Sequence, residues 1–175
     1  MKTLLKYSGF ISLVLVVVAF ILMMSTNAIV IPYELLGNKG QYTVAGTTAI
    51  FGATGTLDLG FTTLTSNTNP SVLALLGWIF MVVGLVIVLC GIVLPLLKIK
   101  VLEKFAGLLN LVAVLLFVVA GVFMFIVVPT FFGANNMDVP ANAAVGAGWV
   151  IGAILAIAGG AFAILPAAAD FLSKK

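Results

Sequence analysis

The residues that could do chemistry in this chain are few and far apart. It has no histidine, and its acidic residues are Glu34, Asp58, Glu103, Asp138 and Asp170. Glu34, Asp58 and Asp138 could offer oxygen ligands to Ca²⁺ if the fold brought them together, but solvated loop positions are the simpler interpretation. General acid–base catalysis usually needs a histidine or paired acids, and phosphate binding needs a Gly-rich loop with its lysine. The sequence shows neither, so we predict a non-catalytic protein with no cofactor and no bound metal.

The composition indicates that lipid surrounds this protein. Of its 175 residues, 63% are hydrophobic and 7% are charged, whereas a soluble domain carries about 25% charged residues. A helix needs roughly 20 apolar residues to cross the hydrocarbon core of a bilayer. Segments of that length lie at about 8–31, 72–97, 105–128 and 144–165. We therefore predict an all-α membrane protein with four transmembrane helices. Its only cysteine, Cys90, lies within the second span and is predicted to be a small packing residue.

The lysines indicate how the helices are oriented. Seven of the eight basic residues lie before the first span, between the second and third, or at the C-terminus, and only Lys39 lies elsewhere. By the positive-inside rule, both termini and the loop near residue 100 are predicted to be cytoplasmic. The lysine-only basic residues and short tails are compatible with a small prokaryotic plasma-membrane protein. No nucleic-acid partner is predicted, because the lysines are dispersed and no aromatic residues are interleaved with them.

The two halves of the chain, 1–99 and 100–175, resemble each other. Residues 2–9 (KTLLKYSG) match residues 100–107 (KVLEKFAG), and Ile29–Pro32 matches Ile126–Pro129. A Gly-Trp pair opens the second helix of each half, and each tryptophan precedes a Leu-Pro pair at the same spacing. We interpret the chain as two tandem parallel hairpin repeats, each contributing two transmembrane helices.

The predicted exterior regions differ between the halves. Residues 33–70 are rich in Gly, Thr, Asn and Ser, and the runs Gln41–Phe51 and Thr56–Thr65 surround a predicted turn at Gly52–Gly55. Their β-branched content favours strands, so we predict an extracellular β-hairpin or small sheet here. The second exterior loop, 130–143, is shorter and has an interfacial aromatic pair followed by a turn. Because loops on a rigid scaffold often carry function, recognition is expected in the first region.

Small residues recur at helical spacing in the second and fourth spans. They are Gly77, Gly84 and Gly91, and then Gly148, Gly152, Gly159 and Gly160. Small residues let helix backbones approach closely in lipid, where no hydrophobic effect drives helices together. Packing within the bundle is the favoured interpretation for the fourth span, and contact with a partner subunit or another copy is the alternative.

Other residues are predicted to act at the membrane boundary or inside it. Trp78 and Trp149 are expected to anchor helices at the lipid head groups. Ser12 and Asn110 are equivalent in the repeat and could hydrogen-bond across the bundle. Ser25–Asn27 interrupts the first span, and we interpret this triplet as the water boundary; the alternative is that it faces other helices.

The layout resembles that of claudin-like and tetraspan-type membrane proteins: four spans, both ends inside, a long β-prone first exterior segment and a short second one. The resemblance covers the whole chain as topology only. The claudin signature in the first exterior segment has a Trp, then Gly-Leu-Trp, and two Cys, whereas residues 33–70 contain neither Trp nor Cys. The resemblance therefore implies the architecture and transfers no junction function and no site residue.

The absence of charged residues well inside the spans bears on function, because such charges usually mark ion and proton pathways. We expect a structural, assembly or accessory subunit that contacts the bilayer and other membrane-protein subunits or copies of itself. It would use its helix faces and its exterior β element. The alternative is an oligomeric channel or a small-solute or lipid transport component, since parallel repeats occur in transporters.

Overall fold

The computed structural model describes residues 2–58, 63–96 and 100–172, with side chains described over 7–55, 67–93 and 108–165. The elements are α1 (Lys2–Ser25), β1 (Asn27–Leu35), β2 (Asn38–Ala45), α2 (Gly46–Phe51), β3 (Ala53–Asp58), β4 (Thr63–Thr68), α3 (Val72–Leu96), α4 (Lys100–Phe125), α5 (Val127–Ala134), β5 (Ala144–Val145) and α6 (Ala147–Leu172). Four of the helices, α1, α3, α4 and α6, are long and apolar enough to cross a membrane. The predicted class, a mostly helical four-span membrane protein with a small β region, is confirmed.

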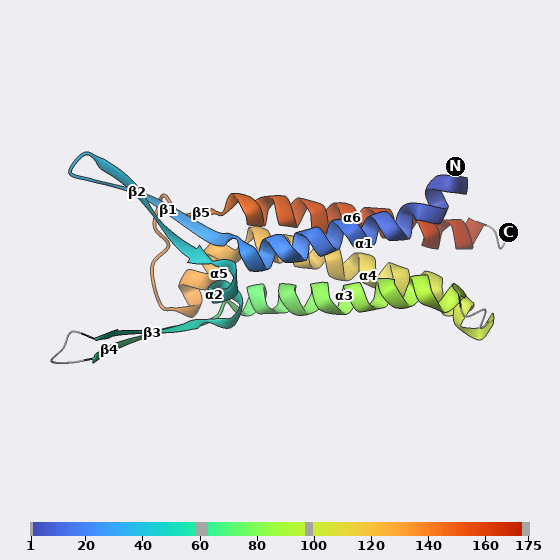
Figure 1. Cartoon of the computed structure of the whole chain (residues 1–175), viewed down its shortest axis with the longest axis horizontal. Coiled ribbons are helices and arrows are strands. Elements are labelled where there is room, and N and C mark those ends of the chain that lie inside the picture. The colour runs from blue at the N-terminus through green and yellow to red at the C-terminus, as the bar shows by residue number, and fades with distance from the viewer. Residues whose placement is uncertain (1, 59–62, 97–99, 173–175) are drawn as a thin grey trace.

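The four long helices lie side by side, and all the strands are at one end of them, here called the strand end (Figure 1). Helix α1 packs extensively on α6, α6 on α4, and α4 on α3, whereas α1 and α3 meet over a smaller surface. The α4–α6 contact is close because Gly121 faces α6, where a Cβ would lie 2.9 Å from the Ala153 carbonyl oxygen. Fully buried Met23, Phe117 and Met124 are among the side chains that fill the interior.

The first long helix ends earlier than predicted, at Ser25, and Asn27–Leu35 continues as strand β1. The hydroxyl groups of Ser25 and Thr26 each donate to the carbonyl oxygen four residues earlier, at 2.7 Å. Such bonds to the preceding turn weaken a helix, and the β-branched run Ile29–Ile31 favours an extended chain. The polar triplet therefore marks the end of the helix, and the last residues of the predicted span 8–31 are strand.

The third span also ends before its predicted limit at residue 128. Helix α4 stops at Phe125, and a separate helix, α5, follows in what was predicted to be a loop. The aromatic pair on α5, Phe131 and Phe132, is buried in the core at the strand end, not placed at a lipid interface as predicted. Ala144–Val145, predicted to start the fourth span, forms β5 and pairs with β1.

The β region has two separate hairpins. In one, β1 and β2 pair antiparallel and β5 adds to β1; in the other, β3 pairs antiparallel with β4. The predicted run Gln41–Phe51 is strand only as far as Ala45, because Gly46–Phe51 forms α2. Gly52 is not part of a hairpin turn: it leaves α2 with a φ of 75°, and a Cβ there would lie 2.5 Å from the Thr68 carbonyl oxygen. The turn between β3 and β4 falls outside the described residues.

Candidate functional site

The junction between α1 and β1 is held by donors from distant parts of the chain. Carbonyl groups in the last turn of a helix lack donors from a following turn. The indole Nε1 of Trp149 donates to one of them, the Met23 carbonyl oxygen, at 3.0 Å. The Gly46 amide donates to the carbonyl oxygen of Thr26, the residue just after α1, at 2.9 Å. Trp149 is fully buried, so the predicted head-group anchor is instead a core residue that ties α6 to α1.

Trp78, the counterpart of Trp149 in the first half, has a different environment. Its ring is half-buried, edge-on to Phe51 at 5.3 Å and 6.4 Å from Phe20. Its Nε1 is buried and makes no hydrogen bond with the described part of the chain. Trp78 thus joins α3 to α1 and α2 through aromatic contacts alone.

The glycines predicted on α3 all face α4. A Cβ at Gly84 would lie 2.4 Å from the ring of the fully buried Phe117, and a Cβ at Gly91 would lie 2.7 Å from the side-chain oxygen of Asn110. Gly77 meets the same helix at Phe123, with 3.4 Å to its Cβ. The α3 glycine stripe is therefore covered by a helix of the same chain.

The glycines predicted on α6 meet two helices. Gly148 lies against the Thr26 side chain just beyond the end of α1, and Gly159 packs on Val16, at Cβ distances of 2.3 Å and 2.5 Å. Gly152 lies between α1 and α4, and Gly160 faces the Val114 carbonyl oxygen of α4 at 3.3 Å. These glycines, too, pack against helix α1, helix α4 or the residue just after α1, so they do not form a glycine surface open to a partner.

The two intramembrane polar residues are not brought together. Ser12 is fully buried on α1, and its Oγ makes no hydrogen bond with the described part of the chain. Asn110 is half-buried on α4 and packs against Gly91. The described hydrogen bonds include none from either side chain to another helix, so the hydrogen bonds across the bundle that the sequence suggested are not seen.

A cluster of polar residues that the sequence reasoning missed joins α5 to the start of α3. Asn135 accepts from the Asn69 amide at 2.7 Å and donates to the carbonyl oxygens of Asn69 and Phe131 at 3.0 and 2.9 Å. Ser71 caps α3 by accepting from the Ala74 amide at 3.3 Å, and its hydroxyl shares a 2.8 Å hydrogen bond with the Thr130 hydroxyl. The N-cap position of Ser71 could have been found in the sequence; its partners on α5 could not.

The β1–β2 hairpin has one apolar face and one polar face. Its cross-strand register places Ile31 opposite Tyr42, Tyr33 opposite Gly40, and Leu35 opposite Asn38 on one face. Tyr33, Leu35 and Tyr42 are 53%, 67% and 62% exposed. We call this the Tyr42 face. The other face carries Pro32, Gln41, Glu34 and Lys39, of which Glu34 and Lys39 lie opposite each other.

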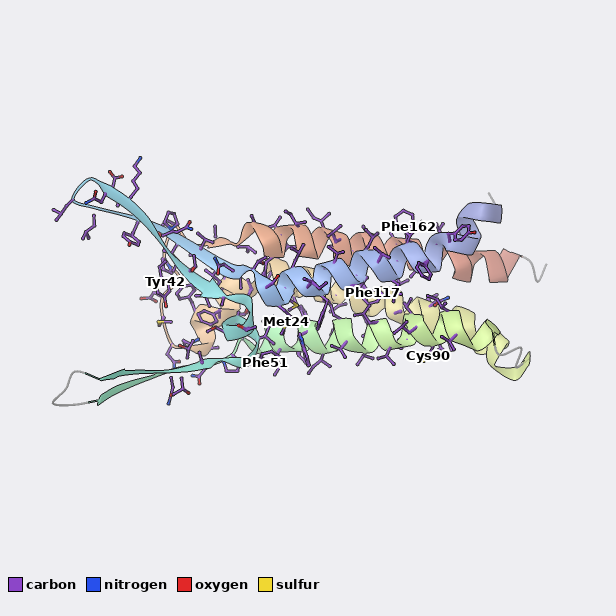
Figure 2. The ribbon with its side chains drawn as sticks, viewed as in Figure 1. Met24, Tyr42, Phe51, Cys90, Phe117 and Phe162 are labelled. Atoms are coloured by element: carbon purple, nitrogen blue, oxygen red, sulfur yellow. The ribbon has the colours of Figure 1, made fainter. Side chains whose placement is uncertain are left out.

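A pocket of about 330 Å³ opens at the base of this hairpin, beside the second one. Its walls are residues 42–45 of β2 and 53–55 of β3, with Thr48, Thr68 and Phe131 completing it. Tyr42, labelled in Figure 2, lines the pocket with its neighbours on the strand. No lining residue is charged, so the pocket suits a neutral ligand or segment.

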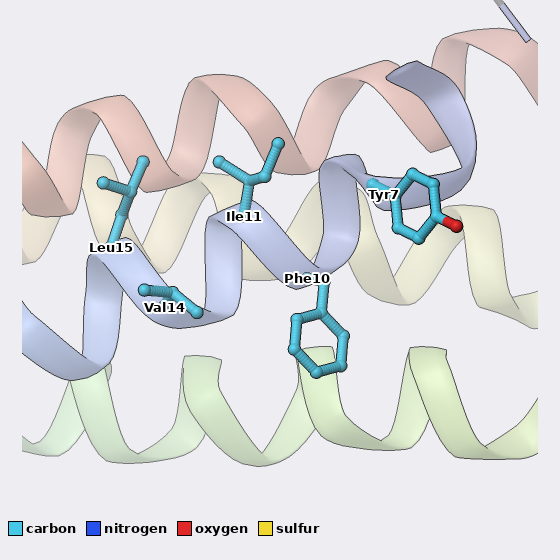
Figure 3. Close-up of a pocket in the computed structure, with 5 residues that line it drawn as sticks. All are labelled: Tyr7, Phe10, Ile11, Val14 and Leu15. Atoms are coloured by element: carbon cyan, nitrogen blue, oxygen red, sulfur yellow. The ribbon is translucent and has the colours of Figure 1, made fainter. Parts of the chain in front are cut away.

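The remaining candidates do not form a site. Glu34 and Asp138 are exposed, Asp58 has no described side chain, and the described residues contain no group of three potential metal ligands. Cys90 is exposed on α3 and not packed inside as predicted (Figure 2). A shallow apolar pocket of about 280 Å³ lies along α1 from Tyr7 to Leu15 (Figure 3). The side chains that line it are of the kind that contact lipid acyl chains on the outside of a membrane helix.

No family model matches the chain, and no curated protein sequence matches it significantly.

Proposed function

We propose that this protein is a non-catalytic assembly or accessory subunit of a membrane complex, and that it contacts its partners mainly through the hairpins at the strand end. In this proposal the protein lies in a plasma membrane with its termini in the cytoplasm and the hairpins outside. The lysine distribution supports that orientation.

The observation that carries the proposal is the exposed Tyr42 face on a hairpin that projects beyond the helices (Figure 1). Tyrosine-rich apolar surfaces without charge are typical of the centres of protein interfaces. The hairpin is also more than a cap for its own bundle, because only the base of its apolar face packs on the core, whereas Tyr33, Leu35 and Tyr42 are exposed.

The helices contribute less to partner contacts than the sequence suggested. The predicted glycine stripes pack against helices of the same chain, and bulky residues such as Val14, Val86 and Ile154 face outward. Lateral contacts with other subunits would therefore use bulky lipid-facing side chains, which pack less closely than glycine seams do.

A solute pathway through one bundle has little support. The described interior is filled by large apolar side chains, among them Phe117, Met81 and Val88, and the buried polar residues on the described part of α1 are two serines, Ser8 and Ser12. A channel would need several copies around a shared axis, with an apolar constriction.

The native mass of the protein after gentle extraction from its own membrane tests the proposal. We expect a defined complex much larger than the 18.2 kDa chain. A bare monomer would contradict the assembly role. A homo-oligomer that conducts ions or small solutes in liposomes would favour the transport alternative.

The two-repeat interpretation is a further part of the proposal, and the packing supports it. In a parallel repeat, α1 corresponds to α4 and α3 to α6, so the α1–α6 and α4–α3 contacts should be alike. Both are extensive, and each contains glycines that face the first helix of the other half: Gly84 and Gly91 face α4, and Gly159 faces α1. The α1–α3 and α4–α6 contacts differ, because the equivalents of Gly121 and Gly160 are larger in the first half.

A further inference from the structure

Two sheet edges lie beside the pocket at the base of the hairpins. The first sheet has the order β2-β1-β5, so β2 is an edge strand; the second contains β3 and β4 alone, so β3 is also an edge. Consecutive residues of β2, 42–45, and of β3, 53–55, form opposite walls of the pocket. An unpaired edge presents backbone N–H and C=O groups that can bind another strand.

The β2 edge lacks the devices that usually block such pairing. Proteins protect exposed edges with charged residues, prolines or bulges. Residues 41–45 (QYTVA) contain no charge and no proline, and the register shift in the hairpin lies between Asn27 and Ile29 of β1, not in β2. The edge is therefore open to strand addition over the part that lines the pocket.

The apolar surface continues from the pocket to the tip of the hairpin. Tyr33 and Leu35 share the face of Tyr42, and Leu36 at the turn is 96% exposed. Leu36 has a φ of 52° and Gly37 a φ of 81°, the backbone of a type I′ turn, which favours Asn-Gly. A leucine in a left-handed conformation and 96% exposed gains little from the described part of the chain, which points to a role outside it.

The hairpin is held in a fixed orientation. The Tyr33 ring covers Gly40 on the opposite strand, where a Cβ would lie 2.6 Å from the ring. At the base, Ile29 and Val44 are buried in the core, and the Asn142 side chain donates to the Pro32 carbonyl oxygen on the other edge. A surface held in this way loses little conformational entropy when it binds.

We infer that the pocket and the Tyr42 face bind an extended, uncharged segment of another protein, which adds as a strand to the free edge of β2 and places side chains between β2 and β3. This inference rests on the proposed assembly function and specifies its partner surface. Strand addition combines main-chain hydrogen bonds with pockets for alternate side chains, and this site offers a free strand edge with a pocket beside it.

Other occupants fit less well. The hairpins project away from the helix bundle (Figure 1), so the Tyr42 face does not lie on the bilayer that holds the helices. Glu34 faces Lys39, so the hairpin carries no excess of positive charge to attract anionic lipid. Copies in one membrane point their β2 strands the same way, so two β2 edges would pair in parallel, the less stable arrangement, whereas a separate protein can add antiparallel.

Photocrosslinking in the native membrane tests the inference. Benzoylphenylalanine replaces the exposed Thr54 on the β3 wall, in the wild-type chain and in chains carrying Tyr42→Lys or Met137→Lys. Both variants replace an exposed apolar side chain by a lysine, but Met137 lies in the loop after α5, outside the strands, so only Tyr42→Lys adds its charge to the Tyr42 face. We expect one protein adduct, reduced at least fivefold by Tyr42→Lys and unchanged by Met137→Lys.

The crosslinked peptide decides what the pocket binds. We expect mass spectrometry to place the adduct in an uncharged segment of a different protein, and a synthetic peptide of that segment to compete with crosslinking. Adducts with lipid or with a second copy of this chain, a charged segment, or a peptide that fails to compete would overturn the inference.

Native mass separates failure of this inference from failure of the proposed function. A large complex that is lost with Tyr42→Lys and with a second variant, Thr54→Lys, but kept with Met137→Lys supports both. A large complex that survives all three variants overturns the inference and leaves the assembly function standing. A bare monomer in the wild type overturns both. Circular dichroism melts of each variant in detergent verify that the chain is folded.

Discussion

The hydrogen bond from Trp149 to the end of α1 can be tested by removing the donor without changing the shape of the ring. Benzothienylalanine has sulfur in place of the indole N–H and nearly the same volume. Placed at position 149, it leaves the Met23 carbonyl oxygen, now 3.0 Å from Nε1, without this donor. Because Trp149 is fully buried, water cannot replace the bond from the side of the ring.

The expected magnitude follows from the burial of the bond. Leaving a buried acceptor unsatisfied costs about 1–3 kcal/mol. For a chain of this size, each kcal/mol shifts the melting temperature by about 2–4 °C, so we expect a decrease of about 2–12 °C. Circular dichroism melts in one detergent, at one lipid-to-detergent ratio, measure the shift.

Trp78 supplies the matched control for this experiment. Its Nε1 makes no hydrogen bond with the described part of the chain, so the same replacement at position 78 removes no bond and should leave the melting temperature unchanged or raise it, because it removes a buried unpaired donor. Equal shifts at the two positions, or no shift at position 149, would refute the reasoning that Trp149 stabilises the end of α1 through its donor.

Three further variants test other parts of the fold. Gly84→Ala places a Cβ 2.4 Å from the buried Phe117 ring and should destabilise the bundle by about 1–3 kcal/mol in detergent melts. The control is Gly133→Ala, whose Cβ meets no atom within 4 Å, so it should be neutral or stabilising by up to about 1 kcal/mol. If Gly133→Ala destabilised the protein more than Gly84→Ala, the packing of α3 on α4 would be contradicted. Leu36→Asn should relieve the left-handed turn and stabilise the hairpin by about 1 kcal/mol, seen as slower amide hydrogen exchange in β1 and β2; faster exchange would show that Leu36 stabilises the free protein. Asn135→Ala removes three hydrogen bonds and should speed amide exchange at the start of α3, with local stability reduced by about 1–3 kcal/mol; unchanged exchange there would rule out a stabilising role for the link to α5.

The number and approximate position of the spanning helices could be read from the chain because they depend on local properties. A run of about 20 apolar residues is long enough to cross the hydrocarbon core whatever its neighbours are. The start of α3 at Val72 could also be predicted from neighbouring residues, since it follows Pro70 and a serine N-cap. Orientation in the membrane stays a prediction from the lysines.

The strand region could be predicted only in part. β-Branched residues marked it as extended, but α2 interrupts the predicted run because Ile50 and Ala49 are buried in the core at the strand end. Short segments such as Gly46–Phe51 take their structure from what they pack against, not from propensity alone. The separation into two hairpins, and the pocket between their edges, follow from that short helix.

The roles of the tryptophans and glycines were decided by tertiary structure. From sequence alone, a Gly-Trp pair at the end of a membrane helix predicts a tryptophan at the lipid head groups and a glycine in a helix–helix contact. In the structure, Trp149 is fully buried and Trp78 lies beside Phe51. The difference depends on which face of α6 meets α1, and that contact joins residues more than 100 positions apart, such as Met23 and Trp149. The sequence by itself determined that the helices cross a membrane, because lipid requires apolar length. Only the tertiary structure decided which donors hydrogen-bond to the carbonyl groups at the ends of those helices. The reason is that a carbonyl group in the last turn of a helix is paired by whichever donor the packing brings within reach.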